Sequence, residues 1–132
     1  RVNDSKPEWV VKKIKLGIDN YLETYPEKTA KDVSLSFYGL AFKANIDDLR
    51  ESPAVRIVNE FCTFHSGPIY IVEPNVSMLP HCFDKCKLVN VKEAIKQGDI
   101  HIILVEHSEF VFEDFQYINA DVFIDTKGLH RK

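Results

Sequence analysis

The chain opens with a helical pattern of apolar residues. Over roughly the first 25 residues, apolar side chains recur every three or four positions, as on one face of an amphipathic helix. These positions are Val11, Ile14, Ile18, Tyr21, Leu22 and Tyr25. Ser5, Pro7 and Glu8 predict the start of the helix through a capping box, and Pro26 predicts its end. We expect the apolar stripe to pack against the body of the protein. A helix whose apolar stripe forms part of a dimer contact would show the same pattern.

After residue 32 the pattern changes to short apolar runs separated by helical segments. Runs rich in Val, Ile and Phe predict five strands, at Val33 to Tyr38, Pro68 to Val72, Lys87 to Val89, Ile100 to Val105 and Val122 to Asp125. Helical spacing covers Pro53 to Phe64, with Ser52 as its N-cap, and Val91 to Gln97, which Gly98 stops. This alternation predicts an α/β fold: a Rossmann-like three-layer domain whose five-stranded parallel sheet carries helices on both faces.

Size and composition narrow the classes of function. The chain has 132 residues, 45% hydrophobic and 28% charged, which fits one globular domain, and its net charge of -3 gives no attraction to nucleic acid. No apolar run approaches the roughly 20 residues that span a bilayer, so we expect a cytoplasmic protein without a membrane partner. Because the chain begins at Arg1 rather than Met and enters a helix at once, we interpret it as a piece of a longer protein.

The cysteines show no pattern of a disulfide framework. Cys62, Cys82 and Cys86 are odd in number and sparse, which suits a reducing compartment. Together with His81, Cys82 and Cys86 lack a fourth ligand at the spacing of a zinc finger. We therefore expect no metal site.

The segment after the first predicted strand carries many charges. Gly39 stands where a dinucleotide-binding loop would begin, but the further glycines of the G-x-G-x-x-G fingerprint are absent. Lys43 and Arg50 are the cations available to meet a phosphate, and Phe42 offers an apolar wall for a base or sugar. A solvated surface in which these cations pair with neighbouring acids explains the same charges. The residues alone leave both interpretations open.

Two other groups of polar residues follow predicted strands. Glu73 stands where dinucleotide folds place a ribose-binding acid, but it lies much further beyond the glycine than the usual ~20 residues, which favours a structural role. His107, Ser108 and Glu109 have the residue types of a catalytic triad. Adjacent residues on one loop cannot face one another as a triad requires, so we interpret Ser108 as the cap of a short turn.

A signalling receiver domain is a rival with similar architecture. Asp47 and Asp48 would imitate its acidic pair, and Lys127 would imitate its lysine after the last strand. However, no aspartate follows the third predicted strand to accept a phosphoryl group. A non-catalytic nucleotide-binding or dimerisation module is a third interpretation.

The block GLAFKANIDDLRESPA, at residues 39–54, carries a family resemblance. Followed in order by VEPN, LVEHSEF and IDTKG, it resembles the C-terminal UDP-binding domain of the UDP-glucose/GDP-mannose dehydrogenase family. Within that family it is most similar to the UDP-N-acetyl-D-mannosamine dehydrogenases. The similarity spans nearly the whole chain, with residues 1–26 resembling the end of the family's central connecting helix and residues 27–132 the UDP-sugar-binding domain.

The resemblance implies an activity for a longer parent protein. That protein would oxidise the C6 alcohol of UDP-N-acetyl-D-mannosamine, or of another UDP-sugar such as UDP-glucose, to a carboxylate in two NAD-dependent steps. The product, UDP-N-acetylmannosaminuronate, would serve surface polysaccharide biosynthesis. The resemblance also implies a homodimer for the full-length enzyme.

The resemblance further implies roles for four residues of this chain. Phe42, Lys43 and Lys127 match positions that contact the UDP-sugar, and Arg50 matches an arginine that reaches NAD. The NAD itself would be held mainly by an N-terminal domain outside this chain. The family's catalytic cysteine stands in a glycine-rich context, which no cysteine here has, so we expect no catalytic residue in this chain.

Overall fold

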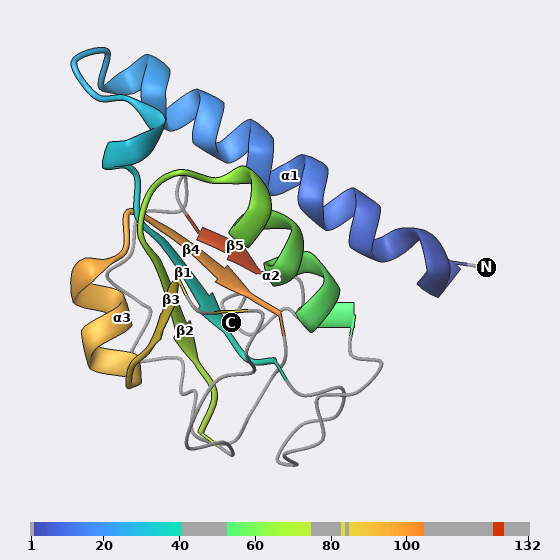
Figure 1. Ribbon diagram of the computed structural model, residues 1–132. Coiled ribbons are helices and arrows are strands. Elements are labelled where there is room, and N and C mark those ends of the chain that lie inside the picture. Colours follow the sequence, from blue (N-terminus) through green and yellow to red (C-terminus); the bar gives the residue numbers. More distant parts are fainter. Residues whose placement is uncertain (1, 41–52, 75–82, 84, 105–122, 126–132) are drawn as a thin grey trace.

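A computed structural model describes residues 2–40, 53–74, 83, 85–104 and 123–125 (Figure 1). In chain order the elements are α1 (Val2–Thr24), the short 3-10 helix η1 (Ala30–Asp32), β1 (Leu35–Tyr38), α2 (Pro53–Phe64), β2 (Ile69–Val72), β3 (Cys86–Leu88), α3 (Val91–Gln97), β4 (Ile100–Ile103) and β5 (Phe123–Asp125). Every predicted strand and helix is therefore confirmed, with the strand ends differing by up to two residues. No helix among the described residues combines the length and the apolar character needed to cross a membrane.

The predicted start of the first helix is wrong. α1 begins at Val2, so Ser5 and Glu8 lie inside the helix rather than forming a capping box before it. The helix also continues through Pro7, although proline has no N–H to donate to the preceding turn. One missing hydrogen bond does not end a helix whose turns on both sides keep helical geometry.

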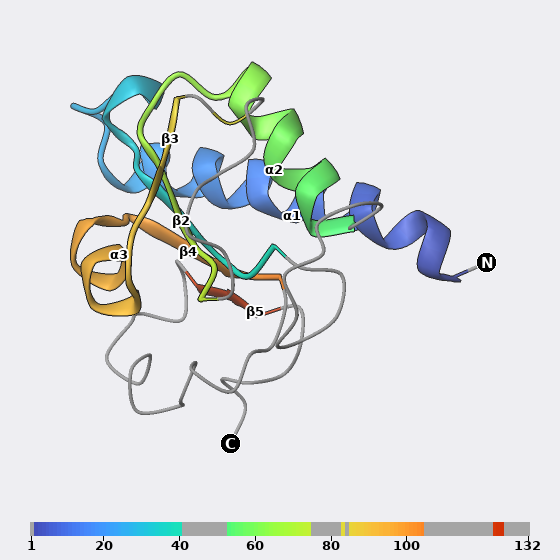
Figure 2. The ribbon, with the colours of Figure 1, turned by 60° about the horizontal axis from the view of Figure 1, so that its bottom comes forward.

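The sheet is parallel throughout, with the strand order β3-β2-β1-β4-β5 (Figures 1 and 2). Tyr38, the last residue of β1, is in register with Val72 at the end of β2 and with Ile103 at the end of β4. Ile103 is in turn in register with Asp125 at the end of β5. The carboxyl ends of four strands therefore share one edge of the sheet, with β1 at the centre.

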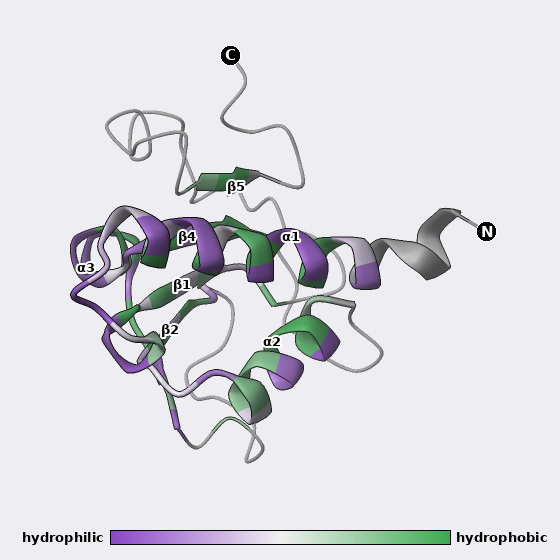
Figure 3. Cartoon of the chain, turned by 90° about the horizontal axis from the view of Figure 1, so that it is seen from above, coloured by the Kyte–Doolittle hydropathy of each residue, from purple (hydrophilic) through white to green (hydrophobic). Residues whose placement is uncertain are grey.

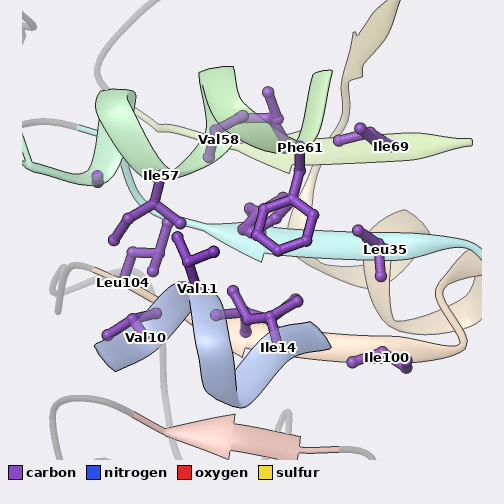
Figure 4. Packing of buried hydrophobic residues seen from close by; sticks show 14 of the residues in the cluster. Val10, Val11, Ile14, Leu35, Ile57, Val58, Phe61, Ile69, Ile100 and Leu104 are labelled. Atoms are coloured by element: carbon purple, nitrogen blue, oxygen red, sulfur yellow. The ribbon is translucent and has the colours of Figure 1, made fainter. Parts of the chain in front are cut away.

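Helices cover both faces of the sheet, which confirms the predicted three-layer architecture. α1 and α2 pack on one face, where Figure 4 shows Val11, Ile14 and Phe61 converging on the strands, and Figure 3 shows the apolar sides of these helices turned inward. α3 packs on the other face, where Ala94 contacts a smaller cluster that includes Tyr38. Side chains alternate along each strand, so neighbouring residues of β1 serve different layers.

The apolar stripe of α1 packs on the body of the protein, as expected. Val11, Ile14 and Ile18 belong to the larger core cluster, and Tyr21 and Leu22 pack against it while remaining partly exposed. The prediction was wrong for Tyr25, which follows the helix and is 42% exposed. Val10, which was not among the positions predicted to pack, is buried in the core.

Polar contacts join α1 to α2 and define the ends of α3. Lys15 Nζ lies 3.8 Å from Glu60 Oε2, across the two helices. At α3 the side chain of Asn90 accepts a hydrogen bond from the backbone N–H of Glu93 at 2.8 Å, as an N-cap does. Gly98 follows the last residue of α3, which confirms it as the helix stop.

Candidate functional site

The strand order identifies one edge of the sheet as a candidate ligand site. The chain builds β1, β2 and β3 outward in one direction and then crosses back to place β4 on the other side of β1. Open parallel sheets bind ligands in the crevice outside the carboxyl ends of the strands at such a switch point. The described residues at this point are Tyr38 at the end of β1, Gly39 and Leu40 after it, Ile103 at the end of β4, and Leu104 after it.

Gly39 makes the turn that leaves β1. Its φ of 98° lies in the left-handed region, which glycine adopts without the penalty that a Cβ imposes. Its backbone N–H donates a hydrogen bond to the carbonyl oxygen of Val72 at 2.8 Å, so the turn is tied to the neighbouring strand. The sequence predicted that a loop begins at this glycine, and the turn confirms it.

Glu73 holds the next residue of the turn. The backbone N–H of Leu40 donates a hydrogen bond to Glu73 Oε1 at 2.6 Å, and both residues are buried. A carboxylate that accepts a backbone N–H forms a charge-assisted bond, stronger than one between neutral groups. This contact supports the structural role predicted for Glu73 over the ribose-binding role.

These two contacts decide how the loop can meet a phosphate. In a dinucleotide fingerprint, backbone N–H groups after the first strand approach the pyrophosphate directly. Here the N–H of Gly39 is bonded to Val72 and the N–H of Leu40 to Glu73, so neither points to a ligand. Any phosphate at this edge therefore needs donors from further along the loop, including side chains.

The site residues predicted from the sequence lie outside the described residues. Phe42, Lys43 and Arg50 fall within residues 41–52, and Lys127 falls within residues 126–132. The described residues do fix where these two segments attach. Segment 41–52 connects the end of β1 to α2, and segment 126–132 directly follows β5, whose last residue is in register with the end of β1 through β4. The residues suggested for a triad and for a receiver's acidic pair also lie outside the described residues.

A buried pair of polar rings joins the two central strands. Tyr38 Oη lies 2.9 Å from His101 Nδ1, and the rings stack with centroids 6.0 Å apart. Burial lowers the pKa of His101 to about 4, against weaker opposing effects from the Gly98 backbone and the charge of Asp99. Burial also raises the pKa of Tyr38. Both rings are therefore neutral at physiological pH and serve as a structural link rather than as an acid and base.

Sequence reasoning missed this pair, although a signal was present. His101 interrupts the apolar run IHII, and in a sheet covered on both faces such a residue must be buried. A metal site is the other kind of site that histidine, cysteine and acidic side chains form. Within the described part of the chain no three His, Cys, Asp or Glu side chains are grouped closely enough to hold a metal ion.

Comparison with known proteins decides the family. The sequence profile of the UDP-glucose/GDP-mannose dehydrogenase family, UDP binding domain, matches residues 36–132. The chain belongs to this family. The matched residues begin within β1 and include the whole candidate edge, so the family's UDP-binding domain coincides with the sheet described above.

Relatives within the family are nucleotide-sugar dehydrogenases. The chain is 40% identical over 131 residues to the UDP-N-acetyl-D-mannosamine dehydrogenase of Salmonella typhimurium, covering 98% of this chain and 31% of the relative. It is 36% identical to an NDP-N-acetyl-D-galactosaminuronic acid dehydrogenase of Ralstonia nicotianae, covering 97% of this chain and 28% of the relative. The solved structure of the UDP-N-acetyl-mannosamine dehydrogenase from S. aureus matches with a TM-score of 0.66 at 25% identity, over 97% of this chain and 28% of that one.

The chain therefore spans about a third of the length of these dehydrogenases.

The strand order separates this fold from that of a receiver domain, the rival suggested by the sequence. In a receiver domain β1 lies between β2 and β3, whereas here it lies between β2 and β4. The architecture thus argues against the receiver interpretation and agrees with the family match.

Proposed function

We propose that this chain is the UDP-binding part of an NAD-dependent UDP-N-acetyl-D-mannosamine dehydrogenase. The full-length protein oxidises the C6 alcohol of the sugar to a carboxylate, giving UDP-N-acetylmannosaminuronate for surface polysaccharide synthesis in the cytoplasm. The family match and the identity of 40% to a UDP-N-acetyl-D-mannosamine dehydrogenase support this proposal. Residues 1–26 are the end of a connecting helix, and residues 27–132 are the UDP-sugar-binding domain.

The observation that carries the proposal is that the backbone N–H groups at the start of the loop are already hydrogen-bonded within the protein. Because Gly39 and Leu40 donate their N–H groups to Val72 and Glu73, the described start of the loop builds no cradle for a pyrophosphate. The binding of the UDP phosphates then falls to charged side chains. Lys43 and Lys127 are cations in the two segments that attach at this edge of the sheet, and they bind the UDP-sugar together with Phe42.

The same observation bears on the cofactor. The described residues do not fit NAD as a dinucleotide fold would hold it, since neither N–H at the loop start is free for a pyrophosphate. NAD is therefore held mainly by another domain of the full-length protein, and this chain contributes Arg50, whose guanidinium forms a bidentate fork suited to phosphate. This chain supplies no catalytic residue. The full-length protein works as a homodimer.

Kinetics of the full-length protein test the substrate assignment. Lys43→Ala should raise KM for UDP-N-acetyl-D-mannosamine roughly 10- to 150-fold, the equivalent of losing a charged hydrogen bond of about 1.5–3 kcal/mol. The matched control is Lys31→Ala, which removes an exposed lysine of η1, before β1 and so away from the carboxyl ends of the strands. An unchanged KM in the Lys43 variant would exclude this residue from the site.

Arg50→Ala separates the cofactor from the substrate. This variant should raise KM for NAD while leaving KM for the UDP-sugar close to the value of the unmodified protein. An unchanged response to NAD would contradict the role of Arg50. UDP-glucose and UDP-N-acetylgalactosamine, offered in the same assay, decide whether another sugar is the preferred substrate.

Direct binding tests the domain without the chemistry. Calorimetric titration of the 132-residue chain with UDP, and with ADP as the control nucleotide, should show preference for UDP. Lys127→Ala should weaken that binding, whereas Lys31→Ala should not. Equal binding of UDP and ADP would indicate a general nucleotide module instead.

A further inference from the structure

Two cysteines from different elements meet at the edge of the sheet opposite the candidate ligand site. Cys62 lies in the last turn of α2, and Cys86 is the first residue of β3, the outermost strand on its side. Their Sγ atoms are 2.7 Å apart, and both cysteines are in the reduced form. Strands and helix alternate in direction, so the end of α2 and the start of β3 both lie at the amino edge of the sheet.

We propose that Cys62 and Cys86 form a reversible disulfide when the protein meets a peroxide, and that this bond clamps α2 to the edge strand. A disulfide requires an S–S bond of about 2.05 Å, so the two sulfur atoms need to approach by only roughly 0.7 Å. Neither residue belongs to the UDP-binding edge, and the proposal does not depend on the substrate of the parent enzyme.

The surroundings of the pair favour the reaction. Cys62 is buried and Cys86 is half-buried, so a small oxidant reaches the pair from the side of Cys86. Lys85, next to Cys86 in the chain, is anchored by its ammonium group, which donates a hydrogen bond to the carbonyl oxygen of His65 at 2.7 Å. The hydrogen bond from Cys86 lowers the pKa of Cys62 most, and the charge of Lys85 lowers it further, while burial raises it. A lowered pKa increases the fraction of thiolate, the form that attacks.

The chemistry balances with hydrogen peroxide as the oxidant. Cys86 gives up its thiol proton, and its thiolate sulfur attacks one oxygen of the peroxide. The O–O bond breaks, a sulfenic acid forms on Cys86, and the departing hydroxide takes up the released proton and leaves as water. The thiolate of Cys62 then attacks the oxidised sulfur, forms the S–S bond and expels hydroxide, which takes up the proton of Cys62 and leaves as a second water. Two cysteine sulfurs are oxidised and one peroxide is reduced. A thiol reductant reverses the reaction by exchange.

The bond would restrain a part of the chain that includes β2. It closes a loop across 24 sequence positions, from the end of α2 through β2 to the start of β3. Closing a loop of this size limits the unfolded chain, so oxidation should raise Tm on the order of 10 °C. Because β3 is an edge strand that pairs only with β2 in the described sheet, the covalent link would add a second attachment to this strand.

Mass spectrometry of the oxidised chain tests the proposal. The folded 132-residue chain is treated with hydrogen peroxide, and its remaining thiols are alkylated. The chain is then digested with trypsin and chymotrypsin together and the peptides are mapped, because Cys62 and Cys82 lie on one tryptic peptide. We expect loss of two hydrogens, one alkylated cysteine of three, a Cys62–Cys86 linked peptide, and a higher Tm that dithiothreitol reverses. Cys82→Ser is the matched control and should form the same link to the same extent.

The alternative outcomes are distinct. A link that contains Cys82, three alkylated cysteines after treatment, or sulfinic acid without a crosslink would each overturn the proposal. Cys62→Ser and Cys86→Ser should each abolish the crosslink and the rise in Tm. Oxidation of the chain in urea is a further comparison, since the unfolded chain has no geometry that favours this pair; an equal yield there would also overturn it.

Discussion

Lowering the pH from 7 to 5 should destabilise this fold through one buried histidine. His101 is 4% exposed within β4, and its Nδ1 lies 2.9 Å from the hydroxyl of Tyr38. Burial lowers the pKa of the His101 imidazole to about 4 in the folded chain, whereas an unfolded chain takes up that proton near pH 6.5. Between these two values the unfolded state binds more protons than the folded state, so acid favours unfolding.

The size of the effect follows from the two pKa values. The contribution of His101 to stability is fully present above pH 6.5 and is lost as the pH falls towards about 4. By that pH, the free energy of unfolding has fallen by about 3 kcal/mol through His101. From pH 7 to pH 5 the loss is about 2 kcal/mol. Because small domains unfold with a free energy of roughly 5–15 kcal/mol, this change is large enough to measure.

Urea unfolding followed by circular dichroism at pH 7 and pH 5 measures the loss. His65 is also buried, and burial lowers its pKa too, so the unmodified chain reports more than one group. The His101→Gln variant isolates the contribution of His101. This variant is less stable at pH 7, but the fall in its free energy of unfolding between pH 7 and pH 5 should be smaller by about 2 kcal/mol. Tyr38→Phe should keep the dependence, because burial and not the hydroxyl is the main cause.

An imidazole titration by NMR gives the direct answer. If His101 of the folded chain titrates near pH 6.5, or if His101→Gln loses as much stability as the unmodified chain, the reasoning from burial is refuted.

Further variants test the core, two glycines and the candidate edge, each by urea unfolding. Phe61→Ala should cost about 3–5 kcal/mol, because the ring is fully buried between the sheet and α1, and a loss below about 1 kcal/mol would show that the site collapses. Gly67→Ala should cost about 3 kcal/mol, since its Cβ would meet two backbone carbonyl oxygens, whereas Gly17→Ala meets only ordinary contact at 3.6 Å and should gain up to about 1 kcal/mol. Glu73→Ala should cost about 1–3 kcal/mol and also weaken UDP binding, whereas Asp99→Ala, which removes a similar bond at the amino edge, should lower stability alone. Intact UDP affinity in the Glu73 variant would show that the turn does not position the ligand site.

Local chemistry accounts for the parts of the fold that the sequence predicted well. Runs of Val, Ile and Phe specify strands, and Pro53 coincides with a helix start because its ring restricts the backbone to a helical φ. Gly98 follows α3 in an extended conformation, at a position where a Cβ would clash with the side chain of Ser36. Gly39 was recognised as the start of a loop from its position after the first predicted strand, and its φ is one that other residues avoid. The start of α1 was misplaced because a capping pattern also occurs inside a helix when the chain upstream is helical.

Contacts between distant residues could not be predicted in the same way. Leu40 and Glu73 are 33 positions apart in the sequence, and Cys62 and Cys86 are 24 positions apart. Each pair comes into contact only because the strand order places its two segments side by side. Strand order follows from how the helices pack on the two faces, which no local pattern encodes. The sequence therefore indicated that Glu73 was structural only from its spacing, and it gave no partner for it.

Polar residues inside the central strands show how the two layers of helix differ. The face covered by α1 and α2 holds the larger apolar cluster, so hydrophobic burial stabilises that layer. α3 has only seven residues and buries fully only Ala94, too little apolar surface to stabilise a layer by itself. On its face Ser36 of β1 donates a hydrogen bond to the carbonyl oxygen of Ala94 at 2.8 Å, and His101 bonds to Tyr38. Hydrogen bonds at buried positions thus supplement packing where the covering helix is short, and for that reason a serine and a histidine occupy strands that are otherwise apolar.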